Sequence, residues 1–197
     1  MKKFLFILLI INALEGLQAQ QYSFFRADTL VSNLLWKCDK HNGTVKLRDG
    51  GFVLEGNQIV AGKFIVDLHT IKDVDMNPKQ FGTAVLILEN TIKNEFFEIE
   101  KYPFAVFDLV DIRHLKADTY ELTGDFTLHG NTLCLTFQAS IRQDLQDITL
   151  KSERFTIDRT DWGVYRMSPK RPYSDDENGW TVPDKIEIEI NLKLQKE

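Results

Sequence analysis

The sequence predicts an all-β protein, an antiparallel β-barrel with one short helix packed on it. In the run from Lys185 to Leu194, every even position is apolar and every odd position is charged or amide. Such period-two alternation places one face of a β-strand in a core and the other face in water. The same alternation recurs along the chain, and tight-turn sequences separate its runs. Consecutive antiparallel strands joined by tight turns favour an up-and-down barrel over a sandwich.

The first nineteen residues have the pattern of a bacterial secretory signal peptide. Two lysines precede an apolar run over Phe4–Ile11, and a short polar segment ends at Ala19. A basic start, a short apolar stretch and a small residue at the cut are typical of such signals. The run is shorter than the roughly 20 residues of a membrane-spanning helix, which disfavours an uncleaved anchor. We therefore expect residues 1–19 to be removed on export to the periplasm or beyond, and residues 20–197 to form one barrel domain.

The composition of the exported part limits its partners. The roughly 178 residues that remain suit a single domain. They carry 22 basic and 28 acidic residues, a net charge of −6, and twelve of the fourteen Phe residues. An acidic chain with scattered charge argues against nucleic acid and anionic membrane surfaces as partners. The aromatic content is ample for the core of a small barrel.

The alternating runs give the strands in chain order. Gly beside Asn or Asp marks turns between the early strands, at His41-Asn42-Gly43, Asp49-Gly50-Gly51 and Glu55-Gly56-Asn57. A tight hairpin is also expected at His129–Thr132. The first expected strand passes through Leu34, Leu35 and Trp36. The others run over Thr44–Leu47, Phe52–Leu54, Gln58–Val60, Lys63–Leu68, Phe104–Val110, Thr119–Leu128, Leu133–Ile141, Thr149–Ile157 and Lys185–Leu194.

The middle of the chain has a different period. Within Gln80–Phe97, the steps from Leu88 to Ile92 and from Ile92 to Phe96 are four residues long. This spacing suits a helix packed over the barrel, although the stretch from Val85 to Leu88 alone is equally compatible with a strand. Pro103 ends the segment. We expect one helix here.

A long polar segment, Asp158–Asp184, separates the last two strands. Loops of this length inside a compact domain are usually functional, or act as a lid. At its start, Arg159 stands between Asp158 and Asp161. An arginine in this position can form a bidentate pair with a carboxylate and pin the loop, and we prefer that structural role to catalysis.

The sequence indicates no catalytic residue, metal site or cofactor. No Ser lies in a nucleophile elbow and no Gly-rich phosphate loop is present. The histidines have no ligand spacing to one another or to a Cys, and two of them fall in Gly-containing turns, where local hydrogen bonding explains them. The four histidines are His41, His69, His114 and His129.

The two cysteines, Cys38 and Cys134, match no metal or redox motif. Export would permit a disulfide between them. Each falls in an expected strand, however, and two buried free thiols are the simpler interpretation.

Aromatic residues are the remaining functional lead. Five of them lie on the apolar face of five different strands: Phe64, Phe107, Phe126, Phe137 and Phe155. In a small closed barrel such residues either fill the centre or line an elongated cavity, and strand parity alone leaves both alternatives open. A long hydrocarbon would suit such a cavity, because burying a five-carbon unit is worth about 3–4 kcal/mol before ordering costs.

Five sequence motifs carry a resemblance to a known family. In order they are Trp36 followed by His41-Asn42-Gly43, then Gly62–Leu68, Asn94–Pro103 with Phe107, Tyr120–Thr132, and Phe155–Gly163. Each motif alone is weak, but five in this order are specific. They cover nearly the whole exported part, which resembles the YceI-like family of exported polyisoprenoid-binding proteins.

The resemblance implies a lipocalin-like barrel whose interior holds a long isoprenoid chain, such as a quinone tail or a polyprenyl lipid, without catalysis. It thereby favours a cavity over a filled centre. Strand parity then gives the expected lining, with Trp36 near one end: Trp36, Phe64, Val66, Phe107, Leu122, Phe126, Leu135, Phe137, Phe155, Ile157, Ile188 and Ile190.

A rival hypothesis belongs to a different class of function. A filled barrel would act as a structural or protein-interaction module, docking through the helix around Phe96 and Phe97 or through the loop at Trp180. An enzyme ranks third, since no redox or catalytic group is evident. The identity of the lipid, its head group and the formation of a homodimer are left open by the sequence.

Overall fold

The structure of the chain is a computed structural model, and it describes residues 21–171 and 180–197. The expected signal peptide and the boundary of the barrel domain at residue 20 lie outside the described residues. One aromatic residue of the long loop, Tyr173, also lies outside them.

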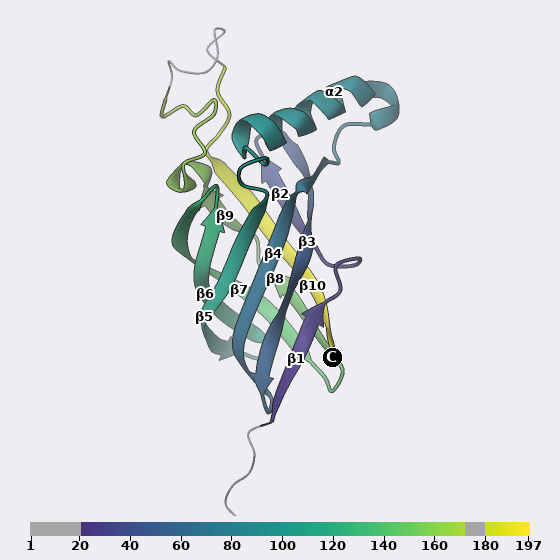
Figure 1. Ribbon diagram of the computed structural model, residues 1–197, viewed down its shortest axis with the longest axis vertical. Helices are drawn as coiled ribbons and strands as arrows, with labels where there is room; N and C mark the ends of the chain where they lie inside the picture. The colour runs from purple at the N-terminus through teal and green to yellow at the C-terminus, as the bar shows by residue number, and fades with distance from the viewer. Residues whose placement is uncertain (1–20, 172–179) are drawn as a thin grey trace, which may run out of the picture.

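The described residues contain ten strands in one antiparallel sheet (Figure 1). The sheet order is β1-β10-β2-β3-β4-β5-β6-β7-β8, and β9 also pairs with β10. The strands are β1 (Tyr22–Ala27), β2 (Asn33–Cys38), β3 (His41–Glu55), β4 (Gln58–Asp73), β5 (Phe104–Lys116), β6 (Thr119–Leu128), β7 (Asn131–Gln143), β8 (Asp147–Ser152), β9 (Phe155–Asp158) and β10 (Lys185–Lys196).

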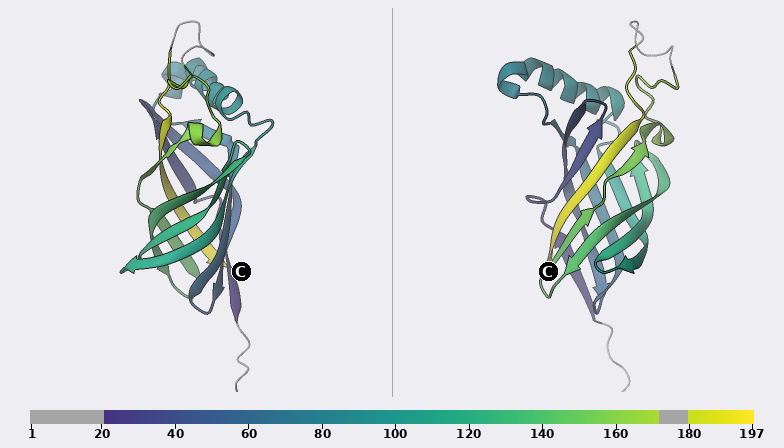
Figure 2. Two further views of the ribbon diagram at one scale, coloured as in Figure 1. Left: turned by 90° about the vertical axis from the view of Figure 1, so that its left-hand side faces the viewer. Right: turned by 180° about the vertical axis from the view of Figure 1, so that it is seen from behind.

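The sheet closes on itself through β10. On one side β10 pairs with β1 and β2, both of which also pair with β3, so these two short strands share one position. On the other side β10 pairs with β8 and β9, which share a second position. The result is a closed eight-stranded antiparallel barrel, which confirms the expected fold class (Figures 1 and 2).

Alternation along the strands places the core inside the barrel. On β4, Phe64, Val66 and Leu68 are each at most 7% exposed. On β6, Leu122 is fully buried. Residues of opposite parity on the same strands carry the charges, as in the outward pair between Lys63 and Asp108. The apolar interior is therefore continuous from strand to strand, as the period-two pattern predicts.

Two of the predicted turns are wrong, because β3 runs unbroken over fifteen residues through both of them. The chain turns earlier, at Asp39, whose φ is 55°. The glycines of β3 instead make room for rings on neighbouring strands. A Cβ on Gly43 would overlap the Lys72 carbonyl oxygen and lie 2.5 Å from Trp36 Cζ2, and one on Gly50 would lie 2.6 Å from Phe64 Cδ1 and 2.7 Å from the Lys63 carbonyl oxygen. Close approach of the neighbouring backbone together with an aromatic ring, rather than a turn, is what requires glycine at these positions.

The ends of the chain hold two further differences from expectation. Strand β1 has no clear alternation and was not expected; it pairs with the second half of β3. The strand expected over Thr149–Ile157 is two strands, β8 and β9, separated by Glu153 and Arg154. Before the break β8 pairs with β7, and after it β9 pairs with the first residues of β10. The backbone N–H of Ile190 beside this break donates to Ser152 Oγ at 2.8 Å.

One helical segment follows β4, as the four-residue spacing predicts. It consists of α2 (Pro78–Asn90) and the π-helical turn η1 (Thr91–Phe96). Asn77 caps α2 by accepting from the Lys79 N–H at 2.9 Å. Both α2 and the short 3₁₀ helix η2 (Arg159–Trp162) lie at one end of the barrel, which we call the α2 end (Figure 2). Among the described helices, none is both long enough and apolar enough to cross a membrane.

Candidate ligand-binding cavity

The barrel interior contains an apolar cavity, and every described side chain that lines it is apolar. Its volume is about 60 Å³, and the wider void between the lining side chains, including space open to solvent, is about 580 Å³. The cavity is thus a narrow slot rather than a wide pocket. It is lined by Leu34, Leu47, Phe64, Val66, Phe107, Leu122, Phe126, Leu135, Phe137, Leu150, Phe155, Ile188, Ile190 and Leu192.

Ten of the twelve residues expected from strand parity line this cavity. Trp36 does not; its ring instead covers Gly43 nearer the α2 end, and its Nε1 is buried without a hydrogen-bond partner. Ile157 is buried in the core but does not reach the cavity wall. The role of all twelve in binding a ligand stays a prediction.

Four cavity residues were missed by the sequence reasoning: Leu34, Leu47, Leu150 and Leu192. Each lies on the inward face of its strand. That strand either contains an expected lining residue or is the neighbour, in the barrel, of a strand that does. The alternation of β10, extended from Ile190 to Leu192, would have found the last of them. Leu47 was missed because it was the last residue of the strand expected over Thr44–Leu47.

A row of phenylalanine rings occupies the middle of the cavity wall. Phe107 and Phe137 have ring centroids 5.5 Å apart, and Phe137 stacks on Phe155 at 4.9 Å with an interplanar angle of 14°. Gly124 leaves room for this row, since a Cβ there would lie 2.4 Å from Phe107 Cζ. These rings reduce the free volume of the slot, and rotating them is the direct way to widen it.

The α2 end of the barrel is closed beside this row of rings. Trp162 of η2 packs its ring on Phe126 with centroids 5.5 Å apart, and its Nε1 donates to the Phe126 carbonyl at 2.9 Å. The side-chain amide of Asn131, at the start of β7, donates to the Trp162 carbonyl at 2.8 Å. These bonds fix η2 against the β6–β7 hairpin.

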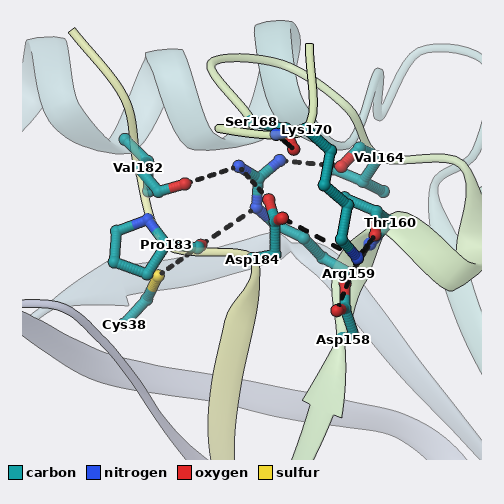
Figure 3. Close-up of polar contacts among 10 residues, drawn as sticks. All are labelled: Cys38, Asp158, Arg159, Thr160, Val164, Ser168, Lys170, Val182, Pro183 and Asp184. Atoms are coloured by element: carbon teal, nitrogen blue, oxygen red, sulfur yellow. Dashed lines mark hydrogen bonds and ion pairs between the residues drawn. The ribbon is translucent and has the colours of Figure 1, made fainter. Parts of the chain in front are cut away.

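Arg159 holds the long loop at this end (Figure 3). It is only 1% exposed. Its Nε donates to the Pro183 carbonyl at 3.2 Å, Nη1 to the Val164 carbonyl at 2.7 Å, and Nη2 to the Val182 carbonyl at 2.9 Å. Nη2 also lies 3.3 Å from Asp184 Oδ1. Burial lowers the pKa of Arg159, and the carboxylate of Asp184 opposes that shift.

Arg159 therefore pins the loop, as predicted. Its carboxylate partner is Asp184, however, and not Asp158 or Asp161. Asp158 instead caps η2, accepting from the Thr160 N–H at 3.0 Å, and pairs with Lys170 Nζ at 2.8 Å. The guanidinium of Arg159 also lies 5.1 Å from the centre of the Phe96 ring, which joins η1 to the loop. The arginine thus joins the two ends of the loop to the π-helical turn.

The two cysteines are free. Cys38 is half-buried; its thiol donates to the Pro183 carbonyl at 3.5 Å, and burial raises its pKa (Figure 3). Cys134 is exposed on β7. The expectation of two free thiols is confirmed, but only one of them is partly buried.

A second polar cluster lies where β4 ends. His41 Nδ1 lies 3.7 Å from Asp73 Oδ2 and 3.4 Å from Asp75 Oδ2. Burial raises the pKa of Asp73, and the neighbouring carboxyl of Asp75 raises it further. His41 was interpreted as a turn residue, but it begins β3 opposite Cys38. The residues of this cluster come from separate parts of the sequence, so no spacing signal could have joined them.

A closed up-and-down barrel with an apolar interior cavity is the fold class that these observations define. The family model of the YceI-like domain matches residues 22–194, and the chain belongs to this family. A UPF0312 protein of Pseudomonas putida strain W619 is 30% identical over 109 residues, which cover 54% of this chain and 52% of the relative. The chain thus spans about half the length of the curated relatives it matches.

Three solved structures share the fold. BcnA of Burkholderia cenocepacia matches with a TM-score of 0.60 at 15% identity, over 85% of this chain and 98% of that one. A polyisoprenoid binding domain from Saccharophagus degradans matches with a TM-score of 0.58 at 14% identity, over 90% and 99%. A YceI protein of Campylobacter jejuni matches with a TM-score of 0.51 at 14% identity, over 82% and 84%.

Proposed function

We propose that this protein binds an isoprenoid-type lipid, with a quinone or polyprenyl tail, inside the barrel. In this proposal it acts as a carrier or store in the periplasm and catalyses no reaction. The observation that carries the proposal is the interior slot, whose lining has no polar side chain. The solved domain of Saccharophagus degradans, described as polyisoprenoid-binding, supports it. Export is supported by the signal-like pattern of residues 1–19.

The energetics favour a long, apolar ligand of small cross-section. Each five-carbon unit buried in the slot gains about 3–4 kcal/mol at roughly 0.8 kcal/mol per CH₂. A charged or hydroxylated ligand would lose its hydration and find no hydrogen-bond partner along the lining. The volume of about 60 Å³ is too small for a long tail, so binding requires the rings of Phe107, Phe137 and Phe155 to move apart.

The same small volume favours a second candidate function, a filled barrel that docks on another protein. The apolar surface available for this lies on α2, where Phe81, Leu86 and Ile87 are 47–61% exposed. Trp180 is 73% exposed in the long loop. The residues first expected to dock, Phe96 and Phe97, are half-buried, and Phe97 packs against the core. Lipid uptake decides between the two functions.

The substitution Phe137→Asp tests the proposal. Phe137 is 6% exposed and its ring lies between those of Phe107 and Phe155. An aspartate there would place an unpaired charge along the tail, and we expect uptake of a fluorescent or radiolabelled isoprenoid to be abolished. The matched control is Gln138→Asp, which puts the same charge on the exposed face of β7 one residue away. Uptake at the level of the native protein by a folded Phe137→Asp variant would refute the assignment.

A second variant protects the test against loss of folding. Val66→Phe keeps the lining apolar but adds a ring to a slot that has little spare volume. We expect its circular dichroism spectrum to match that of the native protein and its uptake of isoprenoid to fall at least about tenfold, which corresponds to about 1.4 kcal/mol. Unchanged uptake would show that the lipid binds elsewhere on the protein.

A further inference from the structure

Three potential metal ligands meet at the α2 end, outside the apolar slot. His41 is the first residue of β3, Asp73 is the last residue of β4, and Asp75 lies between β4 and α2 (Figure 1). One imidazole nitrogen and two carboxylate oxygens from these residues lie within 4.8 Å of one another. The side chain of Asp73 has no exposed surface, whereas those of His41 and Asp75 are 29% and 27% exposed.

Two atoms of this cluster are buried without a hydrogen-bond partner among the described residues. They are His41 Nδ1 and Asp73 Oδ2, which point at each other across 3.7 Å. The other contact, from His41 Nδ1 to Asp75 Oδ2, is 3.4 Å. Both separations exceed the usual 2.7–3.2 Å of an N–H···O hydrogen bond. Buried polar atoms are nearly always paired, so these two atoms indicate a missing ligand.

The backbone holds both carboxylates in place for such a ligand. Asp73 Oδ1 accepts from the Met76 N–H at 3.0 Å, and Asp75 Oδ1 accepts from the Asn42 N–H at 3.1 Å. Each carboxylate is thus fixed through one oxygen and turns its other oxygen toward His41 Nδ1. Hydrogen bonds of this kind orient the ligands of protein metal sites.

The base of the cluster is tied to the helix as well. Glu89 of α2, only 3% exposed, accepts from the Asp73 N–H at 3.2 Å. The nearby ammonium groups of Lys72 and Lys93 lie 2.9 Å and 3.8 Å from Glu89 Oε2. These lysines therefore neutralise Glu89, and the structure records no lysine or arginine pairing with Asp73 or Asp75 in the described residues.

We propose that His41, Asp73 and Asp75 bind one divalent first-row transition-metal ion, of which Zn²⁺ and Mn²⁺ are the best matches. Bonds of about 2.0–2.1 Å in a tetrahedral site place neighbouring ligand atoms about 3.3 Å apart, close to the 3.4 Å and 3.7 Å observed. Two carboxylates and a neutral imidazole balance the charge of the ion. Mixed nitrogen and oxygen ligands suit these metals. At least one coordination position remains for water.

A bound ion would fix the joint between the barrel and α2. Its ligands come from β3, from β4 and from the segment that leads into the helix, so the ion would cross-link all three. Metal binding to the folded state alone stabilises it by mass action. The site is independent of the lipid proposal, and either one can fail without the other.

Titration of the exported protein with ZnCl₂ and MnCl₂ by isothermal calorimetry, after treatment with a chelator, tests this site. We expect one equivalent to bind, with at least tenfold weaker affinity in His41→Ala and in Asp75→Asn. Asp75→Asn is the safer variant because its side chain is partly exposed and the asparagine oxygen can still accept from Asn42. The matched control is His69→Ala, which removes an exposed histidine paired with Asp67 at 2.9 Å, and its affinity should equal that of the native protein.

A thermal melt provides the second readout. The metal should raise the melting temperature of the native protein and of His69→Ala, and should leave that of Asp75→Asn unchanged. The proposal is overturned by the absence of saturable binding at one equivalent, or by equal affinity in Asp75→Asn and the native protein. Equal affinity would place any bound metal on other residues, and no binding would leave the cluster as a histidine–carboxylate ion pair.

Discussion

The middle of the barrel and the surroundings of Arg159 at its α2 end bury side chains in opposite ways. In the middle, apolar side chains face a slot that they do not fill, and no polar side chain lines it. At the α2 end, the buried guanidinium of Arg159 gives hydrogen bonds to three carbonyl groups and contacts Asp184. The slot has unused apolar surface, whereas the Arg159 guanidinium has three carbonyl acceptors and one carboxylate supplied by the protein.

This difference separates a binding region from a structural one. A buried polar group with all its partners has nothing left to offer a ligand, and its removal costs folding energy. An incompletely filled apolar space costs packing energy in the free protein and can regain that energy from a ligand. Added lipid should therefore restore the stability that is lost through a substitution in the slot, but not the stability that is lost through a substitution at Arg159.

The largest effect on stability is expected from Arg159→Ala. It leaves Asp184 without its closest partner and three carbonyl groups without donors, so we expect the free energy of unfolding to fall by about 3–5 kcal/mol. Urea denaturation measures this loss. The control is Arg154→Ala, whose side chain is 60% exposed and pairs with Glu187 at 3.4 Å; its cost should stay below about 1 kcal/mol. Equal costs for the two variants would contradict the structural role of Arg159, and added lipid should restore neither.

A smaller loss is expected from Phe155→Ala in the middle of the barrel. Removing a half-buried ring that stacks on Phe137 should cost about 2–3 kcal/mol. The change also widens the slot, so a saturating isoprenoid should recover more stability in this variant than in the native protein. Leu54→Ala is the comparison, since Leu54 is fully buried but does not line the slot. A filled barrel predicts that lipid restores neither variant.

The smallest effect concerns pH and Asp158. Partial burial would raise the pKa of this carboxyl, but hydrogen bonds from Lys170 and Thr160 lower it below its ordinary value. Because the folded-state pKa is the lower one, Asp158 contributes stability above the unfolded value of about 3.9. That contribution is lost as the pH falls through the folded pKa.

Asp158→Asn should therefore be less stable than the native protein at pH 7 by under about 1 kcal/mol. The difference in stability should shrink below about pH 4, because Asp158 of the native protein becomes protonated there and the variant has no carboxylate at this position. Urea midpoints at pH 7 and pH 3 measure it. Asp161→Asn, a change at an exposed carboxyl on the same helical turn, is the control for the loss of one negative charge at pH 7. A difference that grows on acidification would contradict the sign of the shift.

The sequence predicted the barrel well because alternation is a local signal. The alternation of apolar and polar residues marks the inward face of a strand, so most of the strands and ten of the lining residues follow from parity, whereas β1, which does not alternate clearly, was missed. Glycine was misinterpreted for the opposite reason. A side chain at Gly43 would collide with the Lys72 carbonyl and the Trp36 ring, and one at Gly50 with the Phe64 ring. The sequence does not reveal which groups on neighbouring strands face which glycine.

The polar sites were harder to predict, because their partners come from distant positions. Arg159 binds Asp184 rather than the two carboxylates next to it in sequence. His41 meets Asp73 only because of the register of β3 on β4, which places Gly43 opposite Asp73. Register shifts between Thr44 and Lys46 and between Leu47 and Asp49 determine that pairing, and no local sequence pattern predicts them.

Native mass spectrometry of the exported, mildly purified protein, followed by solvent extraction, tests the central claim most directly. A folded protein carrying one extra mass, which extracts as a quinone or polyprenyl lipid, is the predicted result, and the same spectrum reports whether the protein is a monomer or a dimer. A protein that emerges empty and takes up no added isoprenoid would contradict the claim, and would favour the filled barrel that docks through Phe81, Leu86 and Ile87 of α2.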